Sequence, residues 1–477
     1  MITTERIQHI YFIGICGTAM ATAAAMLKDL GYEVSGSDEG VYPPMSDFLA
    51  RKGIPAHNGF TAAHLTPRPD LVVVGNALSR GNSEIEHMLN AKMRYASLPE
   101  TIKSFLLRDK TSIVVTGTHG KTTTTSMISW ALHNAGLNPD FLIGGIAKNF
   151  QSSYGLGGGA HFVIEGDEYD SAFFDKGPKF LHYLPEVAVI GNLEFDHADI
   201  YPNLDAIKLQ FSRLVNLIPE RGYLAAGGDS AAALEASAKS FCCKETFGLG
   251  TGNDWIARDI EIKGDNLSFR AFYKGEFFLY VRLGIYGTYN VRNSLAAIAV
   301  LHHLGLGKDL IGAAMESFQG VLRRLQKIAE VDGISIYEDF AHHPTAVRET
   351  LQTLRETFHP KRLWAVYEPR SATSRRNVFQ REFADALSYA DCIALPPLYK
   401  PEKTPAGQRL DEEQLIRDLN QAGRTAWNLQ NVECIIRKVC EEALAGDLIV
   451  LLSNGGFDNI YQRLPQALRN RRADGKA

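Results

Sequence analysis

Residues Ser112–Thr125 read SIVVTGTHGKTTTT, and the middle of the chain is built around this stretch. The β-branched residues at its start predict a buried strand, which is followed by a turn with two glycines. The spacing of apolar residues after Lys121 predicts a helix that ends near Gly136. A strand, a glycine turn and a Lys-Thr pair that opens a helix are typical of loops that bind nucleotide phosphates. In such loops, backbone N–H groups, an ammonium and a hydroxyl face the phosphates and magnesium.

The match to the strict phosphate-loop pattern has one departure. Val115 stands where the pattern has glycine, and the glycine lies at Gly117 instead. The alternative is a plain strand-to-helix turn rich in glycine and threonine. The order of strand, turn, Lys-Thr and helix favours the phosphate loop. The predicted nucleotide-binding residues here are Gly117, Thr118, His119, Gly120, Lys121 and Thr122.

Length and composition indicate a large globular protein. The 477 residues suffice for about three domains of about 150 residues each. A net charge of −4 provides no field that would attract nucleic acid. The sequence shows no apolar run of 18 residues, no signal-peptide pattern and no CxxC pair among its six cysteines. We therefore expect a cytoplasmic protein with no nucleic-acid partner, no membrane insertion and no obligatory protein partner.

The first 40 residues have the pattern of a βαβ unit. A strand at His9–Ile13 is followed by Gly14 and Gly17, a helix through Leu30, and a second strand that leads to Asp38. This arrangement is typical of a Rossmann-like nucleotide fold. A dehydrogenase is one interpretation, but the third glycine of the dinucleotide fingerprint is missing and the phosphate loop would stay unexplained.

The remaining pattern predicts an α/β protein of three domains. We expect a Rossmann-like domain at residues 1–108, a central P-loop ATPase domain at 109–320 and a Rossmann-like C-terminal domain at 321–477. The central domain should have a mainly parallel sheet plus antiparallel strands, because alternation and turn signals at Gly264-Asp265 and Lys274-Gly275 follow Gly252. Predicted strands of the third domain are Ile334–Tyr337, Leu363–Tyr367, Cys392–Leu395 and Leu448–Leu452.

Two polar motifs follow predicted strands of the central domain. Glu165 comes directly after the strand 162–164, and Asn192 and His197 come after the strand 187–190. Ligands bind at the carboxyl ends of parallel strands, so these side chains lie beside Thr122 if their strands flank the phosphate-loop strand. A carboxylate, a hydroxyl and an imidazole are suitable ligands for a cation. Alternatively, Glu168 only solvates a loop and His197 is structural.

Further downstream, polar residues mark two helix starts. Asn290 and Asn293 lie in GTYNVRN, where helix capping and adenine contact are both open for Asn290 and contact is favoured for Asn293. Arg324 would stabilise phosphate charge, or it belongs to a surface pair. Asp339 and the His342-His343 pair lie in YEDFAHHPTA, at a strand end before a helix.

The motifs GTHGKTTT, EGDEYD, NLEFDHAD, GTYNVRN and YEDFAHHPTA, in this order, resemble the Mur ligases of peptidoglycan synthesis over nearly the whole chain. The resemblance implies that the first domain holds a UDP-sugar, the second binds ATP and the third supplies a ribose contact and the amine substrate. The implied UDP-sugar residues are Gly14, Gly17, Thr18 and Asp38. Asn293, Arg324 and Asp339 would contact the adenine, phosphates and ribose of ATP.

The resemblance also implies a reaction. The chain would be an ATP-dependent amide ligase that joins UDP-N-acetylmuramate to the cell-wall tripeptide L-alanyl-γ-D-glutamyl-meso-diaminopimelate through an acyl phosphate, in peptidoglycan recycling. Segments such as GNALSRGN and YEPRSAT favour this reaction, as does a long stretch between Glu165 and His197. The alternative within the family is addition of L-alanine, and a regulator that binds ATP without catalysis is the alternative from another class.

Residue roles follow from the same resemblance. Magnesium would be held by Thr122, Glu165 and His197, and the catalytic residues would be Lys121, Asn192 and His197. Arg370 is the candidate for a peptide carboxylate, with a solvent-exposed loop arginine as the equal alternative. Several family members carry a carbamylated lysine 14 or 15 residues after the motif histidine. Phe211 and Ser212 occupy those positions here, so we predict no lysine carbamate.

Overall fold

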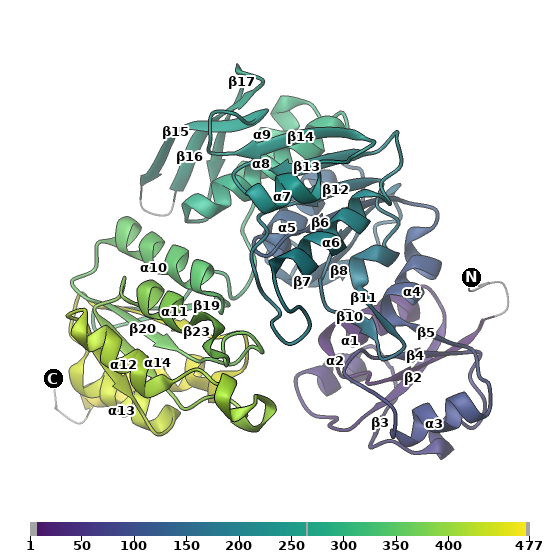
Figure 1. Cartoon of the computed structure of the whole chain (residues 1–477), viewed down its shortest axis with the longest axis horizontal. Coiled ribbons are helices and arrows are strands. Elements are labelled where there is room, and N and C mark those ends of the chain that lie inside the picture. The colour runs from purple at the N-terminus through teal and green to yellow at the C-terminus, as the bar shows by residue number, and fades with distance from the viewer. Residues whose placement is uncertain (1–6, 264–265, 474–477) are drawn as a thin grey trace.

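The computed structural model describes residues 7–263 and 266–473, and they form three α/β domains in chain order (Figure 1). The predicted fold class is confirmed. Strands β1–β5, β6–β17 and β18–β23 fall within the predicted limits of the first, second and third domain. The predicted turn at Gly264-Asp265 lies outside the described residues. Within them, no helix is long and apolar enough to cross a membrane.

The first domain has a five-stranded parallel sheet in the order β3-β2-β1-β4-β5. Strand β1 starts at the predicted residue and β4 beside it is buried along its whole length, which is typical of the centre of a parallel sheet. The strands are β1 His9–Ile13, β2 Glu33–Asp38, β3 Ala56–Asn58, β4 Leu71–Val74 and β5 Tyr95–Ser97. The helices are α1 Thr18–Asp29, α2 Met45–Arg51, α3 Ser83–Asn90 and α4 Leu98–Ile102.

The second domain contains a ten-stranded sheet in the order β17-β16-β15-β14-β13-β12-β6-β9-β7-β8. Its strands are β6 Thr111–Thr116, β7 Asp140–Ala147, β8 Ser152–Gly155, β9 His161–Glu165, β12 Val187–Ile190, β13 Tyr223–Gly227, β14 Cys243–Gly248, β15 Trp255–Lys263, β16 Asn266–Tyr273 and β17 Glu276–Leu283. The helices are α5 Lys121–Asn134, α6 Leu204–Val215, α7 Ala231–Ala236, α8 Thr288–His303 and α9 Lys308–Glu316. The last three strands pair antiparallel, as predicted.

Strand β6 lies inside this sheet because its side chains are apolar on both faces. Ile113, Val114 and Val115 are at most 1% exposed. Ile113 packs with α5, α8 and α9, whereas Val114 belongs to a cluster shared with α6 and the first domain. Parallel pairing to β12 on one side and β9 on the other confirms that the strands before Asn192 and Glu165 flank the phosphate-loop strand.

A two-stranded hairpin leaves the second domain toward the first. It consists of β10 Asp170–Ala172 and β11 Asp175–Pro178, which pair only with each other among the described strands. At its tip the Phe174 ring meets Tyr95 of the first domain edge to face, with 5.0 Å between ring centroids. At its base Lys179 Nζ lies 2.7 Å from Asp167 Oδ2. The hairpin therefore connects the first domain with the motif that follows β9.

The third domain has a six-stranded sheet in the order β18-β19-β23-β20-β21-β22, in which only β18 is antiparallel to its neighbour. The strands are β18 Gln326–Val331, β19 Ile334–Asp339, β20 Leu363–Tyr367, β21 Cys392–Leu395, β22 Thr425–Asn428 and β23 Leu448–Leu452. The helices are α10 Pro344–Phe358, α11 Gln380–Leu387, α12 Glu412–Gln421, α13 Val432–Glu442 and α14 Ile460–Ala473. Separate apolar clusters cover the two faces of this sheet.

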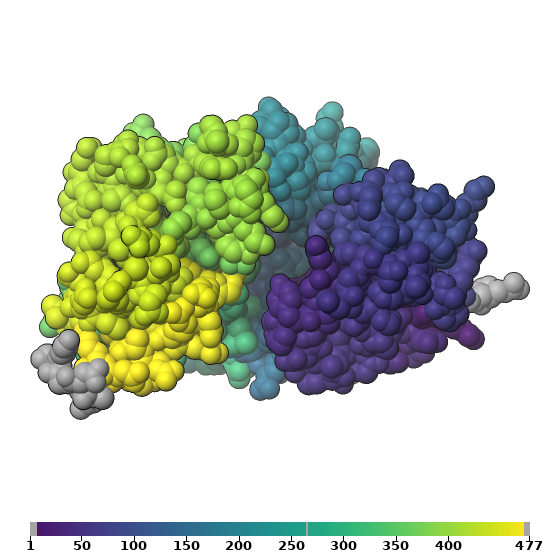
Figure 2. All heavy atoms as spheres, turned by 90° about the horizontal axis from the view of Figure 1, so that it is seen from below, coloured from purple at the N-terminus to yellow at the C-terminus, as the bar shows by residue number. Residues whose placement is uncertain are grey.

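The first and third domains lie on either side of the second (Figure 1). Figure 2 shows a hollow between them, with the second domain behind it. The first domain packs closely on the second, since one apolar cluster includes side chains of both. A polar contact adds to it, because the Tyr154 hydroxyl of β8 donates to Asp29 Oδ2 of α1 at 2.8 Å.

A buried carboxylate holds the antiparallel part of the central sheet together. Glu245 of β14 accepts hydrogen bonds from the hydroxyls of Tyr223 and Tyr273 and from the indole N–H of Trp255, at 2.5 to 2.8 Å. Burial alone would raise the pKa of this carboxyl, but the hydrogen bonds outweigh burial and lower it. The ionised form is therefore part of the folded structure.

We expect Glu245→Gln to lower the free energy of unfolding at pH 7 by about 2 kcal/mol, because an amide cannot replace a charged acceptor of three donors. The pKa of Glu245 is lowered by folding, so its contribution is complete above the ordinary value of 4.5 and is lost as pH falls further. Urea denaturation at pH 7 and at pH 3.5 measures this. Glu261→Gln, at an exposed carboxyl on β15, is the matched control. Equal midpoints at pH 7 would contradict the assignment.

Candidate functional site

One cavity of about 770 Å³ lies where the second and third domains meet. Its walls come from the loop after β6, the ends of β9 and β12, the start of α8 and the segment after β19. The sequence-predicted residues that line it are Thr118, His119, Gly120, Lys121, Thr122, Glu165, Asn192, His197, Asn293, Arg324 and Asp339. The structure thus brings the predicted nucleotide and metal residues together at one place.

The loop after β6 requires its two glycines. Gly117 has φ of +124° and Gly120 has φ of +80°, a region that side chains rarely adopt. A β-carbon at Gly120 would also lie 2.2 Å from Asn293 Oδ1, and one at Gly117 would lie 2.9 Å from the backbone nitrogen of Gly191. Helix α5 starts at Lys121, so the N–H groups of its first turn have no partner within the helix and face the loop that lines the cavity.

The Lys121 ammonium is buried and paired. Its Nζ donates to the Gly117 carbonyl at 2.7 Å and to Glu168 Oε2 at 2.8 Å. Burial alone would lower the pKa of Lys121, but Glu168, Asp167 and Glu165 outweigh burial and raise it. The lysine is therefore positively charged in the cavity wall. Glu168, which the sequence left open as a loop residue, is only 3% exposed and is its main partner.

Thr122 and Glu165 form a second pair beside the lysine. The Thr122 hydroxyl donates to Glu165 Oε1 at 3.1 Å, and the other carboxylate oxygen accepts the N–H of Gly144 at 2.8 Å. Arg324 of the third domain donates to the same hydroxyl at 3.3 Å. A hydroxyl and a carboxylate oxygen at this spacing are oxygen ligands of the kind that magnesium prefers.

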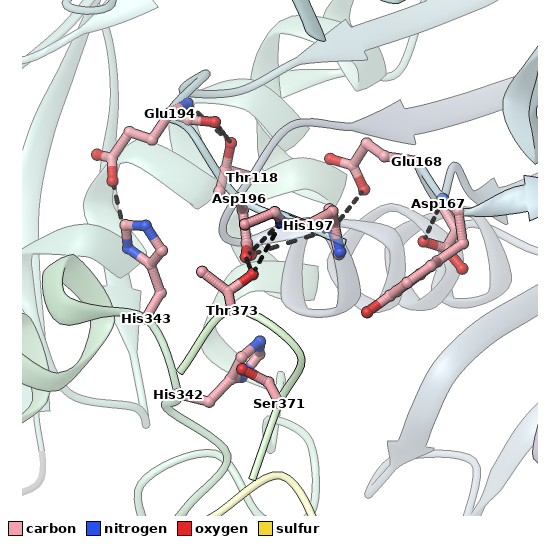
Figure 3. A network of polar contacts seen from close by, with 12 residues as sticks. Thr118, Asp167, Glu168, Glu194, Asp196, His197, His342, His343, Ser371 and Thr373 are labelled. Atoms are coloured by element: carbon pink, nitrogen blue, oxygen red, sulfur yellow. Dashed lines mark hydrogen bonds and ion pairs between the residues drawn. The ribbon is translucent and has the colours of Figure 1, made fainter. Parts of the chain in front are cut away.

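His197 lies on the other side of the lysine pair. Its Nε2 is 3.8 Å from Glu168 Oε2, and its ring packs against Tyr169 with 4.3 Å between centroids (Figure 3). His197, Asp167 and Glu168 have ligand atoms within 4.8 Å of one another. The structure therefore groups His197 with these two carboxylates, whereas Thr122 and Glu165 form the neighbouring pair. Lys179 and Lys121 offset the effect of burial and lower the pKa of Asp167 to about 2.

Asn192 holds the phosphate loop in place. Its backbone carbonyl accepts the N–H of Thr118 at 2.8 Å, and its side-chain Oδ1 accepts the N–H of His119 at 3.2 Å. Its side-chain Nδ2 donates to Glu194 at 3.1 Å. All three contacts are made to the loop or to the adjoining motif. The geometry thus gives Asn192 a positioning role in the loop, and the predicted catalytic role stays a prediction.

Asn293 and Asp339 are both engaged in the wall of the cavity. Asn293 Nδ2 donates to Asn290 Oδ1 at 2.9 Å, within helix α8. Asp339 accepts the N–H groups of Leu325 and Ala341 at 2.6 and 2.7 Å, one on each oxygen. Burial raises the pKa of Asp339, although Arg324 opposes this. The Asp339 carboxylate thus orients the backbone just before β18 and just after β19, and its predicted ribose contact stays a prediction.

The third domain reaches the motif after β12 through two hydroxyls that the sequence did not single out. Thr345 Oγ1 donates to Glu194 at 2.7 Å. Thr373 Oγ1 donates to Asp196 at 2.6 Å (Figure 3). Burial alone would raise the pKa of Asp196, but neighbouring imidazoles and the Thr373 hydrogen bond lower it. Both threonines lie in quoted motifs, YEDFAHHPTA and YEPRSAT, but only the fold shows that their partners are carboxylates of the second domain.

The predicted UDP-sugar residues lie at the carboxyl ends of β1 and β2 in the first sheet. Gly14 follows β1 with φ of +86°, Gly17 and Thr18 open α1, and Asp38 ends β2. Asp38 Oδ2 accepts the N–H of Cys16 at 2.9 Å, which places the carboxylate against the turn. These four described residues lie outside the cavity between the second and third domains.

Arg370 also lies outside that cavity, in the third domain. It follows β20, its guanidinium carbon is 3.7 Å from the centre of the Tyr399 ring, and its Nη1 is 3.5 Å from Glu368 Oε1. The side chain is 26% exposed. It is therefore held in a defined position with a face open to solvent.

The two positions at which several family members carry a carbamylated lysine are occupied here by Phe211 and Ser212. Phe211 is fully buried in the apolar core, and the Ser212 hydroxyl donates to the Ala236 carbonyl at 3.2 Å. Lys208, the nearest lysine on α6, pairs with Asp205 and Glu235. The predicted absence of a lysine carbamate stays a prediction.

Comparisons with known proteins find matches along the whole chain. Residues 9–110 match the model described as Mur ligase family, catalytic domain, residues 115–301 match the Mur ligase middle domain, and residues 323–455 match the Mur ligase, glutamate ligase domain. These three segments correspond to the three domains of the structure.

Individual relatives span nearly the same length. A Haemophilus influenzae protein named UDP-N-acetylmuramate–L-alanyl-gamma-D-glutamyl-meso-2,6-diaminoheptandioate ligase is 40% identical over 97% of this chain and 99% of its own. A Desulforapulum autotrophicum UDP-N-acetylmuramate–L-alanine ligase is 31% identical over 96% of this chain and 98% of its own. The crystal structure of a murein peptide ligase from Psychrobacter arcticus 273-4 has 37% identity and a TM-score of 0.73, over 97% of this chain and 99% of the other.

We expect Asn192→Ala to weaken ATP binding by about 10-fold, because losing one structural hydrogen bond of the phosphate loop costs about 1.4 kcal/mol. Isothermal titration with a nonhydrolysable ATP analogue measures the change. Asn203→Ala is the matched control, since Asn203 caps α6 by accepting the N–H of Ala206 at 3.0 Å. The control should leave ATP affinity unchanged. Equal affinities of both variants would contradict the positioning role.

Proposed function

This chain belongs to the Mur ligase family, and on that premise we propose that it joins UDP-N-acetylmuramate to L-alanyl-γ-D-glutamyl-meso-diaminopimelate with hydrolysis of ATP. The observation that carries this proposal is the full-length identity to the Haemophilus influenzae ligase, which exceeds the identity to the L-alanine ligase. Such an enzyme would act in recycling of cell-wall peptides. We place it in the cytoplasm, where ATP and nucleotide-sugars are available.

The proposed division of labour follows the domains. The first domain, residues 1–108, would bind the UDP part of the sugar at Gly14, Gly17, Thr18 and Asp38. The second, residues 109–320, would bind ATP in the cavity, and the third, residues 321–477, would close the cavity and hold the peptide. Support for this comes from the cavity lining, which contains residues of the second and third domains.

The residues at the end of the phosphate loop fit a magnesium ion. Thr122 Oγ1 and Glu165 Oε1 lie 3.1 Å apart and would share the ion, and Asp167, Glu168 and His197 form a second candidate ligand group. When bound, magnesium would neutralise charge on the phosphoryl oxygens of ATP. This would make transfer of the terminal phosphoryl group easier.

The chemistry needs an activated carboxylate, because the oxygen of a free carboxylate is a poor leaving group. The lactyl carboxylate oxygen of the sugar attacks the γ-phosphorus and ADP leaves, which yields an acyl phosphate. The amine of the tripeptide then attacks the carbonyl carbon, loses a proton, and inorganic phosphate leaves. Lys121 provides a fixed positive charge beside the transferring group, and Arg324 adds a second cation from the third domain.

Exclusion of water is the second task of the site, since water would hydrolyse the acyl phosphate. The hydrogen bonds of Thr345 and Thr373 hold the third domain against the motif after β12. Closure of this kind keeps the reactive intermediate away from bulk solvent. The hydrogen bonds of Thr345 and Thr373 would therefore protect the acyl phosphate from hydrolysis.

The test of this function is phosphate release from ATP with each substrate offered separately. We expect release to require UDP-N-acetylmuramate and the tripeptide together. Lys121→Ala should lower kcat by about 100-fold, equivalent to about 3 kcal/mol of lost electrostatic stabilisation. Lys208→Ala, at a lysine of α6 that pairs with Asp205 and Glu235, should leave turnover unchanged.

Other outcomes of this assay identify the rival functions. Faster release with L-alanine would identify an L-alanine ligase. ATP binding without release under any combination would identify a regulator. Normal turnover of Lys121→Ala would contradict the role of the phosphate-loop lysine.

We expect Arg370→Ala to raise the KM for the tripeptide by about 10-fold, because a guanidinium binds a carboxylate through two charged hydrogen bonds. The KM for ATP should not change, since Arg370 lies outside the nucleotide cavity. Steady-state kinetics with each substrate varied in turn measures both. Arg417→Ala, at an exposed arginine of α12, is the matched control. An unchanged tripeptide KM would place the peptide elsewhere.

A further inference from the structure

A further group of side chains that could hold a metal ion lies at the boundary between the second and third domains. One ligand atom each of His119, Glu194 and His343 lies within 4.8 Å of the other two. His119 and Glu194 belong to the second domain, and His343 belongs to the third. Figure 3 shows the His343 ring facing the Glu194 carboxylate. We propose that these three side chains form a binding site for a transition-metal ion of the zinc class that bridges the two domains.

The ligand set distinguishes this site from the magnesium pair. Two imidazoles and one carboxylate bind Zn²⁺ and Co²⁺ well, whereas magnesium prefers oxygen ligands and keeps several waters. The pair formed by Thr122 and Glu165 offers only oxygen atoms. The two sites would therefore select different ions from the same solution.

The spacing of the ligand atoms agrees with a tetrahedral ion. His119 Nε2 is 3.4 Å and His343 Nδ1 is 3.5 Å from Glu194 Oε2. Both distances are long for hydrogen bonds. Two ligands about 2.1 Å from one zinc ion lie about 3.4 Å apart at the tetrahedral angle. An ion can thus be accommodated between these atoms after small side-chain rotations.

Outer hydrogen bonds orient two of the three ligands. His343 Nε2 lies 3.1 Å from the Phe195 carbonyl, which can only accept, so Nε2 carries the proton and Nδ1 is free to bind an ion. Glu194 accepts the Thr345 hydroxyl at 2.7 Å and the Asn192 amide at 3.1 Å. One contact competes, because the N–H of Thr345 approaches His343 Nδ1 at 3.3 Å. A bound ion would replace this weak hydrogen bond.

The site is open to the cavity and would affect its closure. His119, Glu194 and His343 all line the 770 Å³ cavity, so an ion can enter from the side that admits nucleotide. Because the ligands come from two domains, a bound ion would add coordination bonds across the boundary that Thr345 and Glu194 already span. Bound metal should therefore stabilise the closed arrangement of the two domains.

The experiment uses the full chain without nucleotide, titrated with Co²⁺ and followed by its visible absorption, with Zn²⁺ as competitor. We expect about one equivalent of tetrahedral Co²⁺ that Zn²⁺ displaces. His343→Gln and Glu194→Gln should each weaken binding by more than about 10-fold. X-ray absorption at the zinc edge should show two imidazole ligands.

Two histidine variants serve as controls. His182→Gln removes an imidazole that pairs with Asp175 at 2.6 Å, and the described residues offer this pair no third ligand. This variant should bind Co²⁺ as the unchanged chain does. His197→Gln tests the competing group of Asp167, Glu168 and His197, and it should also retain the ion. Both controls change one histidine to glutamine, as His343→Gln does.

The proposal is overturned if His343→Gln and Glu194→Gln bind Co²⁺ as the unchanged chain does, or if His197→Gln is the variant that loses the ion. His343 caps α10, so thermal unfolding shows whether its variant is folded. If it is not folded, the decision rests on Glu194→Gln, whose amide keeps the shape of the side chain. The measurement needs no substrate, so its result does not depend on the proposed ligase reaction.

Discussion

The pairing of one buried ammonium with the carboxylates around it constrains the whole central domain. Lys121 is charged in a site where burial disfavours charge, and it tolerates this position because Glu168 lies 2.8 Å away. Glu168 comes to that place because β9 lies directly beside β6. Strand order, loop glycines and the acidic motif therefore act together to hold a positive charge in the wall of the cavity.

The two domain boundaries are built from different interactions. The first domain shares an apolar cluster with the second, and burial of apolar surface holds them together. The third domain meets the cavity through polar contacts such as Thr345 with Glu194 and Thr373 with Asp196. Hydrogen bonds of this kind exchange with water at small net cost. Ring contacts such as Phe195 with Phe379 add to this second boundary, so it is mixed, whereas one apolar cluster dominates the first.

Residue patterns within single segments predicted the fold well. Contacts between segments distant in the sequence could not be predicted in this way. The phosphate loop, β1, β12, β20, β21 and β23 follow from residue patterns within one segment. The helix start predicted at GTYNVRN is also found, since α8 begins at Thr288 directly after Gly287. The role of Glu168 and the contacts of Thr345 and Thr373 depend on residues 47 to 177 positions away, which no local pattern contains. Asp339 differs from these residues, because its oxygens accept backbone N–H groups only 2 and 14 positions away.

The β10–β11 hairpin has a mechanical consequence. One continuous piece of backbone runs from Glu168 through the Phe174 tip on the first domain and returns at Lys179 to Asp167. Ion pairs across it, such as Lys176 with Asp170, stiffen this piece. The packing of the first domain on the second therefore also fixes the backbone that carries Glu168, the partner of Lys121. In this way a domain none of whose described residues lines the cavity stabilises the position of a charged pair in the cavity wall.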